Sequence, residues 1–236
     1  MPTSAPYSSL VRRYARYAPD YDRRWARYNE ATLAIAERLI TRHAPRAAAL
    51  LDVGCGTGLL AQRLRRRRPE LHLIGVDVCE DMLDRARHKF AGDCRAEFIS
   101  ATAEALPFAD ESCDVVACTS AFHLVRDQET ALAEFHRVLV PGGILVLLDW
   151  DRRAAAVRLV SALYRAVGRH RRRILRHDEA YGMIDQADFE IIEAHSHKAT
   201  AIWGISAIVA RSPALFTVNV PPASRARVLS STRAGH

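Results

Sequence analysis

The chain has 236 residues, of which 49% are hydrophobic, and a formal net charge of +7 at pH 7. This length and apolar content suit one α/β domain with a sizeable core. No apolar run approaches the ~18 residues of a membrane-spanning helix, and the N-terminus lacks the basic and apolar segments of a secretion signal. We therefore expect a cytoplasmic protein without a membrane span.

The cysteines and the basic residues further limit the classes of protein to which the chain can belong. Five cysteines, odd in number and without a C-x-x-C pair, favour reduced thiols, and we expect no metal site. The arginine runs Arg65–Arg68 and Arg169–Arg173 are candidate nucleic-acid patches, because a basic surface attracts phosphate. Solvated helix ends are the favoured interpretation, since arginine near a helix C-terminus also suits the helix dipole.

The first predicted elements are two helices. Residues 8–17 place Leu10, Tyr14 and Tyr17 on one face, and Pro19 ends that helix. A second helix is predicted over about 22–42, with apolar residues at alternating steps of three and four. Together they form an N-terminal segment of about 8–42 ahead of the first strand.

A strand, a glycine-rich turn and a helix follow at residues 50–64. Glycines at 54, 56 and 58 let the backbone turn sharply and let a ligand lie against it. Their spacing is G-x-G-x-G, not the G-x-G-x-x-G of dinucleotide sites, with Asp52 just ahead. Asp77 ends the next apolar run, where a carboxylate can accept hydrogen bonds from ribose hydroxyls. Together the turn and the acid predict a nucleoside ligand.

The remaining elements continue this alternation. The fourth strand is nearly all apolar, as a strand buried on both faces should be, and it ends in Ser120, Phe122 and His123. We predict helices over about 80–90, 127–139, 152–170 and 178–187, strands over 96–99, 113–119, 144–148, 189–197 and 201–211, and a turn at 141–143. One domain, residues 1–212 with a core of about 47–150, would precede a loose tail at 213–236.

Five motifs in this order resemble those of class I S-adenosylmethionine-dependent methyltransferases, in detail the group of the ubiquinone and menaquinone C-methyltransferases. They are residues 52–58, 76–78, 103–108, 113–116 and 137–143. The resemblance implies a Rossmann-like, doubly wound sheet of seven strands, mostly parallel with an antiparallel C-terminal strand. It also implies that the N-terminal helices form a lid over the cofactor.

The resemblance also implies a cofactor and its site. S-adenosyl-L-methionine would be bound, leaving S-adenosyl-L-homocysteine as product, with Asp77 on the ribose. Met82 would lie near the adenine, or merely pack in the core. Thr102 stands where the family usually has an aspartate and would accept one hydrogen bond from the adenine. The full set of implied cofactor-binding residues is Asp52, Gly54, Cys55, Gly56, Gly58, Asp77, Val78, Met82, Thr102, Ala103, Glu104 and Ser120.

Two residues are candidates for catalysis. His123 could serve as a general base because its ordinary pKa lies near neutrality, or it could cap a helix or line the pocket without chemistry. Tyr21 belongs to a Tyr-Asp pair found in related enzymes, and it either faces the acceptor or packs the lid helices. Aromatic residues of the lid, with Phe122, His123 and Trp150, are expected at the pocket mouth.

Three function classes remain open. The favoured one is methyl transfer to a small, largely apolar acceptor by a monomer or homodimer. An RNA methyltransferase would use the arginine runs and bind with a steep salt dependence. A non-catalytic relative would bind the cofactor without turning over an acceptor.

Overall fold

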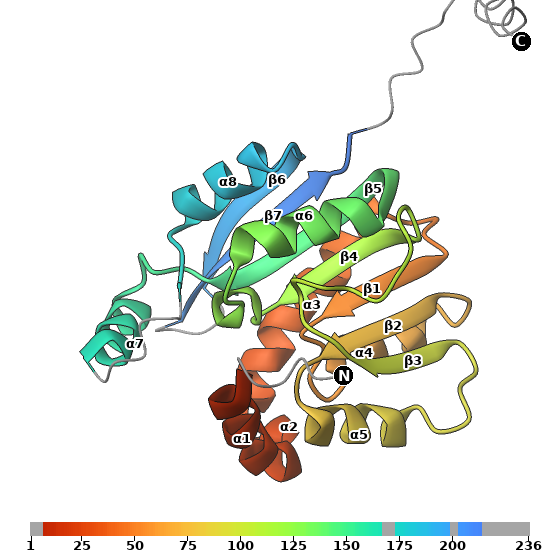
Figure 1. The fold of residues 1–236 in the computed structure, drawn as a ribbon, viewed down its shortest axis with the longest axis horizontal. Helices are drawn as coiled ribbons and strands as arrows, with labels where there is room; N and C mark the ends of the chain where they lie inside the picture. Colours follow the sequence, from red (N-terminus) through yellow and green to blue (C-terminus); the bar gives the residue numbers. More distant parts are fainter. Residues whose placement is uncertain (1–6, 167–172, 199–202, 214–236) are drawn as a thin grey trace, which may run out of the picture.

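The computed structural model describes residues 7–166, 173–198 and 203–213. A seven-stranded sheet runs through the centre in the order β3-β2-β1-β4-β5-β7-β6 (Figure 1). All neighbouring strands are parallel except the pairs made by β7. This arrangement confirms the predicted fold class. The strands are β1 (Ala49–Val53), β2 (His72–Asp77), β3 (Ala96–Ser100), β4 (Cys113–Thr119), β5 (Leu139–Trp150), β6 (Glu190–Lys198) and β7 (Gly204–Arg211).

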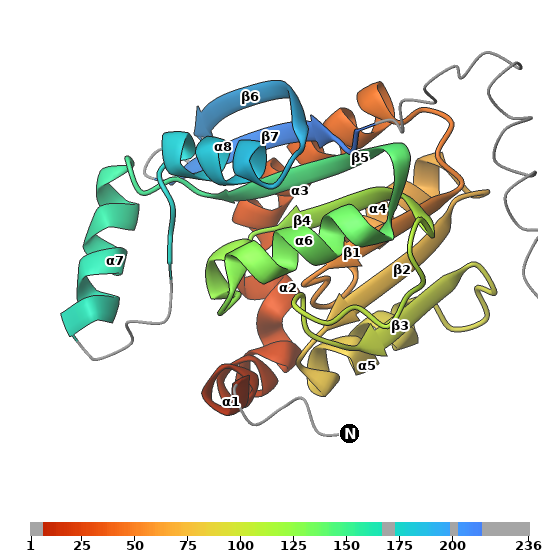
Figure 2. The ribbon, with the colours of Figure 1, turned by 45° about the horizontal axis from the view of Figure 1, so that its top comes forward.

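Helices cover both faces of the sheet. The α-helices are α1 (Ser8–Tyr17), α2 (Tyr21–Arg24), α3 (Ala26–His43), α4 (Leu59–Arg67), α5 (Glu80–Lys89), α6 (Gln128–Val138), α7 (Ala155–Ala166) and α8 (His177–Gln186), with short 3-10 turns at η2 (Ala18–Asp20) and η3 (Phe122–Leu124). Helices α3, α4 and α5 pack on one face, and α6 and α8 pack on the other. Helix α7 stands away from the sheet (Figure 2).

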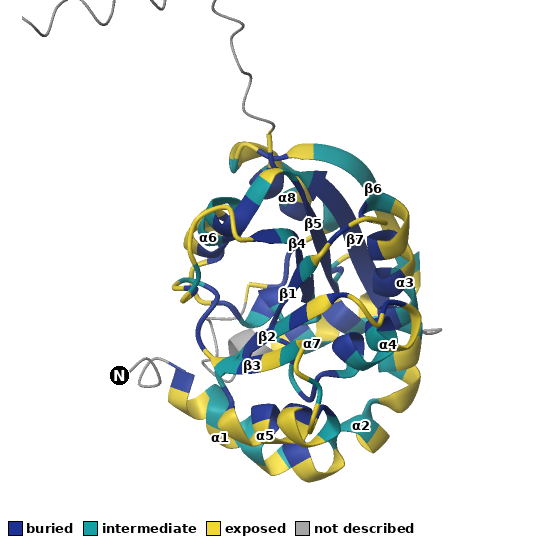
Figure 3. Ribbon diagram, turned by 90° about the vertical axis from the view of Figure 1, so that its right-hand side faces the viewer, coloured by how far each residue is buried: buried dark blue, intermediate teal, exposed yellow. Residues whose placement is uncertain are grey.

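The central strands are buried on both faces, as their apolar sequences require. Leu50 and Val115 belong to the core beneath α3, α4 and α5. Their neighbours Leu51 and Val116 belong to the core beneath α6 and α8, because successive side chains point to opposite faces. Figure 3 shows these strands as continuous buried segments. The sheet is thus held on two sides, and its strand ends are fixed relative to each other.

The two largest differences from the sequence prediction concern the helix over 22–42 and the start of the strand predicted at Ile144. The single helix predicted over 22–42 is broken at Trp25, whose backbone leaves the helical region, so α2 and α3 are separate. Strand β5 begins before the predicted Ile144, at Leu139, because Leu139 already pairs with Cys113 of β4. The predicted turn at 141–143 is therefore part of the strand.

Some predictions fall on parts of the chain outside the described residues. These are the tail over 214–236, the end of the predicted helix 152–170, the first two residues of the predicted strand 201–211, and most of the run Arg169–Arg173. Within the described ranges, no helix is long and apolar enough to cross a membrane.

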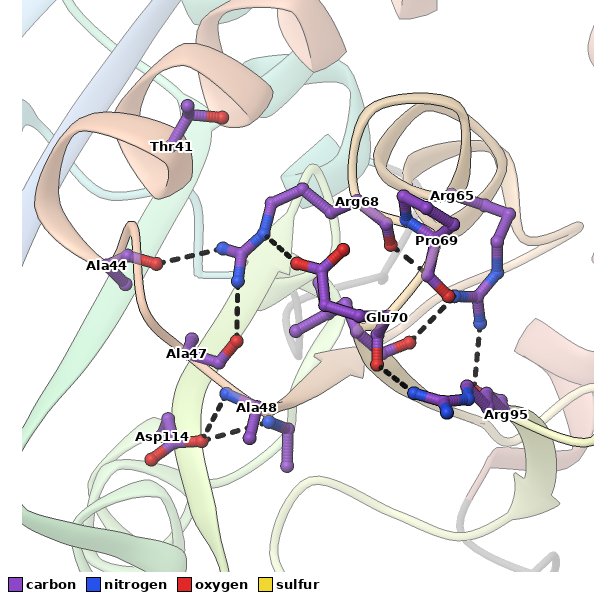
Figure 4. A network of polar contacts seen from close by, with 12 residues as sticks. Thr41, Ala44, Ala47, Ala48, Arg65, Arg68, Pro69, Glu70, Arg95 and Asp114 are labelled. Atoms are coloured by element: carbon purple, nitrogen blue, oxygen red, sulfur yellow. Dashed lines mark hydrogen bonds and ion pairs between the residues drawn. The ribbon is translucent and has the colours of Figure 1, made fainter.

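Two arginines of the run at the end of α4, Arg65 and Arg68, connect neighbouring loops through hydrogen bonds (Figure 4). Arg68 donates to the backbone carbonyl oxygens of Ala44 and Ala47, which lie between α3 and β1. Arg65 donates to a carboxylate oxygen of Asp93 at 2.7 Å and to backbone carbonyls of the neighbouring loops. Guanidinium groups engaged in this way are held against the protein and are poorly placed to bind phosphates.

Candidate functional site

A cavity opens at the carboxyl ends of β1, β2 and β4, where the strand order reverses and ligands bind in open α/β sheets. Its empty volume, including the mouth, is about 720 Å³. The glycine turn, the end of β2 and the loop after β4 form its walls, and residues from the N-terminal segment cover it. The lining residues are Tyr7, Leu10, Tyr14, Tyr21, Val53, Gly54, Gly56, Val76, Asp77, Val78, Cys79, Met82, Ala101, Ala103, Cys118, Thr119, Ser120, Ala121, Leu124 and Val125.

The glycine turn brings bare backbone to the cavity wall. Gly54 and Gly56 have φ values of +75° and +53°, in the left-handed region that favours glycine. A Cβ at Gly54 would lie 2.3 Å from the Cβ of Ala121, so the turn packs closely against the loop after β4. A Cβ at Gly56 would meet no protein atom within 4 Å. Gly56 therefore presents its backbone to open space that a ligand can fill.

Asp77 at the end of β2 holds this turn in place. Its carboxylate accepts hydrogen bonds from the backbone N–H of Gly56 and of Cys79, each at 2.9 Å. Burial raises the pKa of Asp77, and these backbone donors oppose that rise. The carboxylate retains lone pairs for further donors, such as the hydroxyls of a ribose.

A second, smaller cavity adjoins the first on the α3 side of the glycine turn, and Tyr21, Gly54, Gly56 and Ser120 line both. Among the described residues, the buried Oδ1 of Asp52 and the buried Nδ2 of Asn29 have no hydrogen-bond partner. Both residues line this second cavity. Burial, aided by the charge of Asp77, raises the pKa of Asp52 to about 7. The smaller cavity thus holds an unpaired hydrogen-bond acceptor and an unpaired hydrogen-bond donor. Burying either group costs free energy unless a ligand or water forms a hydrogen bond with it.

The N-terminal segment is anchored over the cavity by polar contacts. The Tyr7 hydroxyl donates to Glu104 Oε1 at 2.5 Å and accepts from the backbone N–H of Arg126 at 3.2 Å. Asp22 of α2 accepts a hydrogen bond from Thr57 in the glycine turn and pairs with Lys89 of α5, each at 2.6 Å. These contacts fix α1 and α2 above the glycine turn and beside α5 (Figure 1).

The sequence-predicted site residues form two groups, those that line one of the two cavities and those that line neither. Most lie where a ligand can reach them: Gly54, Gly56, Asp77, Val78, Met82, Ala103, Ser120 and Tyr21 line the main cavity, and Asp52 and Cys55 line the smaller one. Four others, Gly58, Thr102, Glu104 and His123, line neither. Gly58 packs against Ala86 and Phe98, and Glu104 is occupied by Tyr7. Thr102 is buried, so its predicted contact with the adenine has no support from the cavity wall.

His123 is held in place by Asp149 at the end of β5. Its Nδ1 lies 2.7 Å from Asp149 Oδ1, and its backbone N–H donates to Asp149 Oδ2 at 2.5 Å. The imidazole ring stacks on Trp150 with centroids 4.3 Å apart. His123 is buried and lines neither cavity, so the structure gives no support to its role as a general base.

The expected aromatic mouth is only partly present. Tyr14 and Tyr21 line the cavity, whereas Phe122 is buried against Phe135 in the core beneath α6. The sequence reasoning missed Tyr7, Leu10 and Asn29, which come from the N-terminal segment. The helical period alone could not identify them, because residues on a buried face have the same spacing whether they pack or line a cavity.

Comparisons with known proteins agree with this geometry. Residues 51–147, which run from β1 to β5, match the family described as "Methyltransferase domain". The chain is 39% identical over 150 residues to the demethylmenaquinone methyltransferase of Deinococcus radiodurans, covering 63% of this chain and 58% of that protein. It is 32% identical over 167 residues to the ubiquinone/menaquinone biosynthesis C-methyltransferase UbiE of Syntrophotalea carbinolica, covering 70% of this chain and 65% of that protein. The chain thus spans less than two thirds of these relatives.

A solved structure from Thermotoga maritima, described as a "SAM-dependent methyltransferase, possible histamine N-methyltransferase", is similar in fold. The TM-score is 0.67 at 22% identity, over 86% of this chain and 99% of that one. At this identity the likeness concerns the fold alone. Taken together, the comparisons confirm the resemblance inferred from the five motifs and imply S-adenosylmethionine as the methyl donor.

Proposed function

Residues 51–147 are a methyltransferase domain, and from this premise we propose that the chain transfers the methyl group of S-adenosylmethionine to a small, largely apolar aromatic acceptor. The observation that carries the proposal is the covered cavity at the carboxyl ends of β1, β2 and β4, with Tyr7, Leu10 and Tyr14 over it. Sites for small molecules are concave and mostly apolar, with a few polar groups that fix orientation.

The residues around the two cavities fit the methyl donor. Asp77 offers lone pairs to ribose hydroxyls, and Gly56 lets the ligand approach the backbone. The amino-acid end of the donor carries an ammonium and a carboxylate. These match the unpaired acceptor of Asp52 and the unpaired donor of Asn29 in the smaller cavity. Two orphaned buried groups of opposite kind are therefore satisfied by one zwitterion.

When bound, the sulfonium supplies an activated methyl group whose leaving group is a neutral thioether. What the protein contributes is position and the exclusion of water. Burial raises the pKa of Tyr21 well above its ordinary value, so its hydroxyl stays protonated at neutral pH. Tyr21 accordingly donates a hydrogen bond to ligand or acceptor and does not act as a base. Its place in the lining of both cavities suits it to orient the two substrates.

The acceptor class follows from the cavity and from the named relatives. Both sequence relatives are named for methylation in quinone biosynthesis. By analogy, the acceptor assigned to this chain is a hydroxylated aromatic ring with apolar substituents. The apolar side of the cavity, with Leu124 and Val125, suits such a ring. Arg65 and Arg68, two of the four arginines of that run, are held by contacts within the protein and are poorly placed for the phosphates of an RNA acceptor.

A labelled-donor assay tests the proposal. Methyl-labelled S-adenosylmethionine is incubated with the full chain and either an alkyl-substituted hydroquinone, a small-molecule extract or total RNA. We expect label in the small-molecule fractions, with a mass gain of one methylene unit in the product. Gly56→Ala is the control that should lose the signal, because its Cβ occupies ligand space. Label in RNA alone, or in no fraction, would overturn the proposal.

A further inference from the structure

Three polar side chains form a hydrogen-bonded chain that ends at the cavity. The indole N–H of Trp150 donates to the Tyr28 hydroxyl oxygen at 2.9 Å. That hydroxyl oxygen lies 2.7 Å from Ser120 Oγ. Trp150 ends β5, Tyr28 lies on α3, and Ser120 follows β4 and lines both cavities. Three separate elements thus converge on one serine hydroxyl.

The proton inventory fixes the first bond of this series. An indole N–H can only donate, so the Tyr28 oxygen is the acceptor of its bond with Trp150. Burial raises the pKa of Tyr28 far above its ordinary value, so Tyr28 keeps a proton of its own. Either hydroxyl can donate in the bond between Tyr28 and Ser120. When Tyr28 donates, the proton of Ser120 is left to point into the cavity, and each bond in such a series polarises the next.

Further contacts hold the hydrogen-bonded series Trp150–Tyr28–Ser120 in place. The Trp150 ring stacks on His123, and His123 is itself fixed by Asp149. Ser120 has a φ of +57°, which is unusual for a residue with a side chain, and its backbone N–H donates to Leu148 at 2.7 Å. Strained backbone of this kind clusters at ligand sites, where the surrounding structure holds it. A donor held in this way needs little reorganisation on binding.

We propose that the Ser120 hydroxyl is the hydrogen-bond donor to the ring oxygen of a phenolic acceptor, and that Tyr28 and Trp150 are the positioning residues that aim it. This inference rests on the proposed function and deepens it. Asp77 and Asp52 are acceptors at the ends of β2 and β1, where the methyl donor fits, whereas Ser120 comes from the loop after β4. Ser120 lines the main cavity together with apolar Ala121 and Leu124, and it also lines the smaller cavity.

The consequence for the acceptor is a change in its acidity. A hydrogen bond donated to a phenol oxygen favours the ionised form, so it lowers the pKa of the bound phenol, which releases its proton to bulk water. Ionisation places negative charge on the ring oxygen and on the ring carbons beside it, which are the nucleophiles in O- and C-methylation. Ser120 would thus raise the nucleophilicity of the ring without accepting a proton itself.

A chromogenic phenol measures this effect without turnover. An alkyl-substituted nitrophenol is bound to the full chain in the presence of S-adenosylhomocysteine, and its absorbance is titrated against pH. The wild-type protein should lower the apparent pKa of the bound phenol by about one unit. Ser120→Ala and Tyr28→Phe should return it close to the value of the free phenol.

Matched controls separate positioning from folding and from donor binding. Tyr17→Phe removes a tyrosine hydroxyl from α1, outside this chain, and should leave the phenol pKa unchanged. Calorimetry with S-adenosylhomocysteine should give affinities within about twofold of wild type for Tyr28→Phe, because Tyr28 itself lines neither cavity. A tenfold loss of that affinity with an unmoved phenol pKa would assign the chain to the methyl donor and overturn the inference.

The remaining outcomes are also decisive. Failure of the wild-type protein to bind the nitrophenol, or binding without a pKa shift, would contradict the role of Ser120. Absence of methyl transfer to every small acceptor, with the pKa shift intact, would remove the proposed function and leave the phenol site. The two proposals can therefore fail separately.

Discussion

The two sides of the cavity are built in different ways. The donor side is the part of the cavity, from Asp52 to Cys79, where the methyl donor is proposed to bind. It is built from backbone conformation and from contacts between residues close in sequence, such as the hydrogen bond from the Gly56 N–H to Asp77. The acceptor side joins residues far apart: 92 positions separate Tyr28 from Ser120, and 97 separate Tyr7 from Glu104. The difference teaches that the donor side is a local motif to which Asn29 of α3 is added, whereas the acceptor side depends throughout on the packing of distant elements.

The two sides also differ in how firmly they are attached. The strands of the donor side are buried on both faces, whereas α1 and α2 contribute no fully buried residue within their spans. Elements with few buried contacts open at lower free energy than the core. We therefore expect the donor side to stay formed without ligand and the N-terminal helices to open locally. The following predictions test these differences between the two sides of the cavity.

The largest effect should come from the glycine turn. Gly54→Ala adds a Cβ that overlaps Ala121 at a positive φ, so we expect loss of donor binding and a stability decrease of about 2–5 kcal/mol. Gly56→Ala meets no protein atom and should cost only the ~1–2 kcal/mol of the strained backbone, yet it should also lose donor binding. Thermal unfolding and calorimetry with S-adenosylhomocysteine separate the two. Equal stability of both variants would show that the turn is not packed against Ala121.

The next effect concerns Asp77. Replacing it by Asn removes an acceptor from the Gly56 and Cys79 backbone bonds and from the ribose. We expect donor affinity to fall by about 1.5–3 kcal/mol, the scale of hydrogen bonds to a charged group. Asp81→Asn, at an exposed position in the first turn of α5, is the matched control and should bind normally. A normal affinity in Asp77→Asn would place the ribose elsewhere.

A smaller effect per pH unit is a pH dependence of stability caused by Asp52. Because burial raises its pKa from 3.8 to about 7, the folded protein holds a proton that the unfolded chain releases between those pH values. The contribution of Asp52 to stability should therefore be full below about pH 4 and decline as the pH rises toward 7, by up to about 1.4 kcal/mol per pH unit. His177 and His197, whose pKa values burial lowers, act in the opposite sense.

The quantity to measure is thus the difference between wild type and Asp52→Asn in chemical unfolding at several pH values. The variant should lack the decline that Asp52 causes, so its stability relative to wild type should increase from pH 4 to pH 7. Donor binding near pH 6.5 should release protons in the wild type, because an ammonium beside Asp52 favours its ionised form. A difference that does not change with pH would mean that Asp52 is charged in the free protein.

The smallest effect should be local and confined to the N-terminal helices. Tyr7→Phe removes the hydroxyl that bridges Glu104 and the Arg126 backbone, so the segment should open more readily, by about 1 kcal/mol. Trypsin should then cut at the arginines of α1 and α2 several times faster than in wild type. Saturating S-adenosylmethionine should slow the cutting if the segment acts as a lid. Tyr17→Phe is the control. Equal rates with and without ligand would mark the segment as ordinary structure.

The sequence by itself determined the fold class and identified the glycine turn and the acidic strand ends that line the cavities. Glycine spacing, Asp52 and Asp77 at strand ends, and apolar strands alternating with amphipathic helices are local patterns that follow from backbone sterics and side-chain periodicity. For this reason α1, α5, β4 and α8 were predicted to within a residue or two at each end. The exceptions, the break at Trp25 and the early start of β5, depend on pairing and packing with other elements.

Only the tertiary structure decided which side chains face the cavity. Phe122 and His123 follow Ser120 by two and three positions, yet the turn after β4 buries both and leaves Ser120 exposed to the ligand space. Asn29 and Thr32 of α3 reach the smaller cavity, and Tyr28 reaches Ser120, because α3 crosses the sheet beside the glycine turn. Such contacts depend on how elements far apart in the chain pack together, and no periodicity within one element encodes that arrangement.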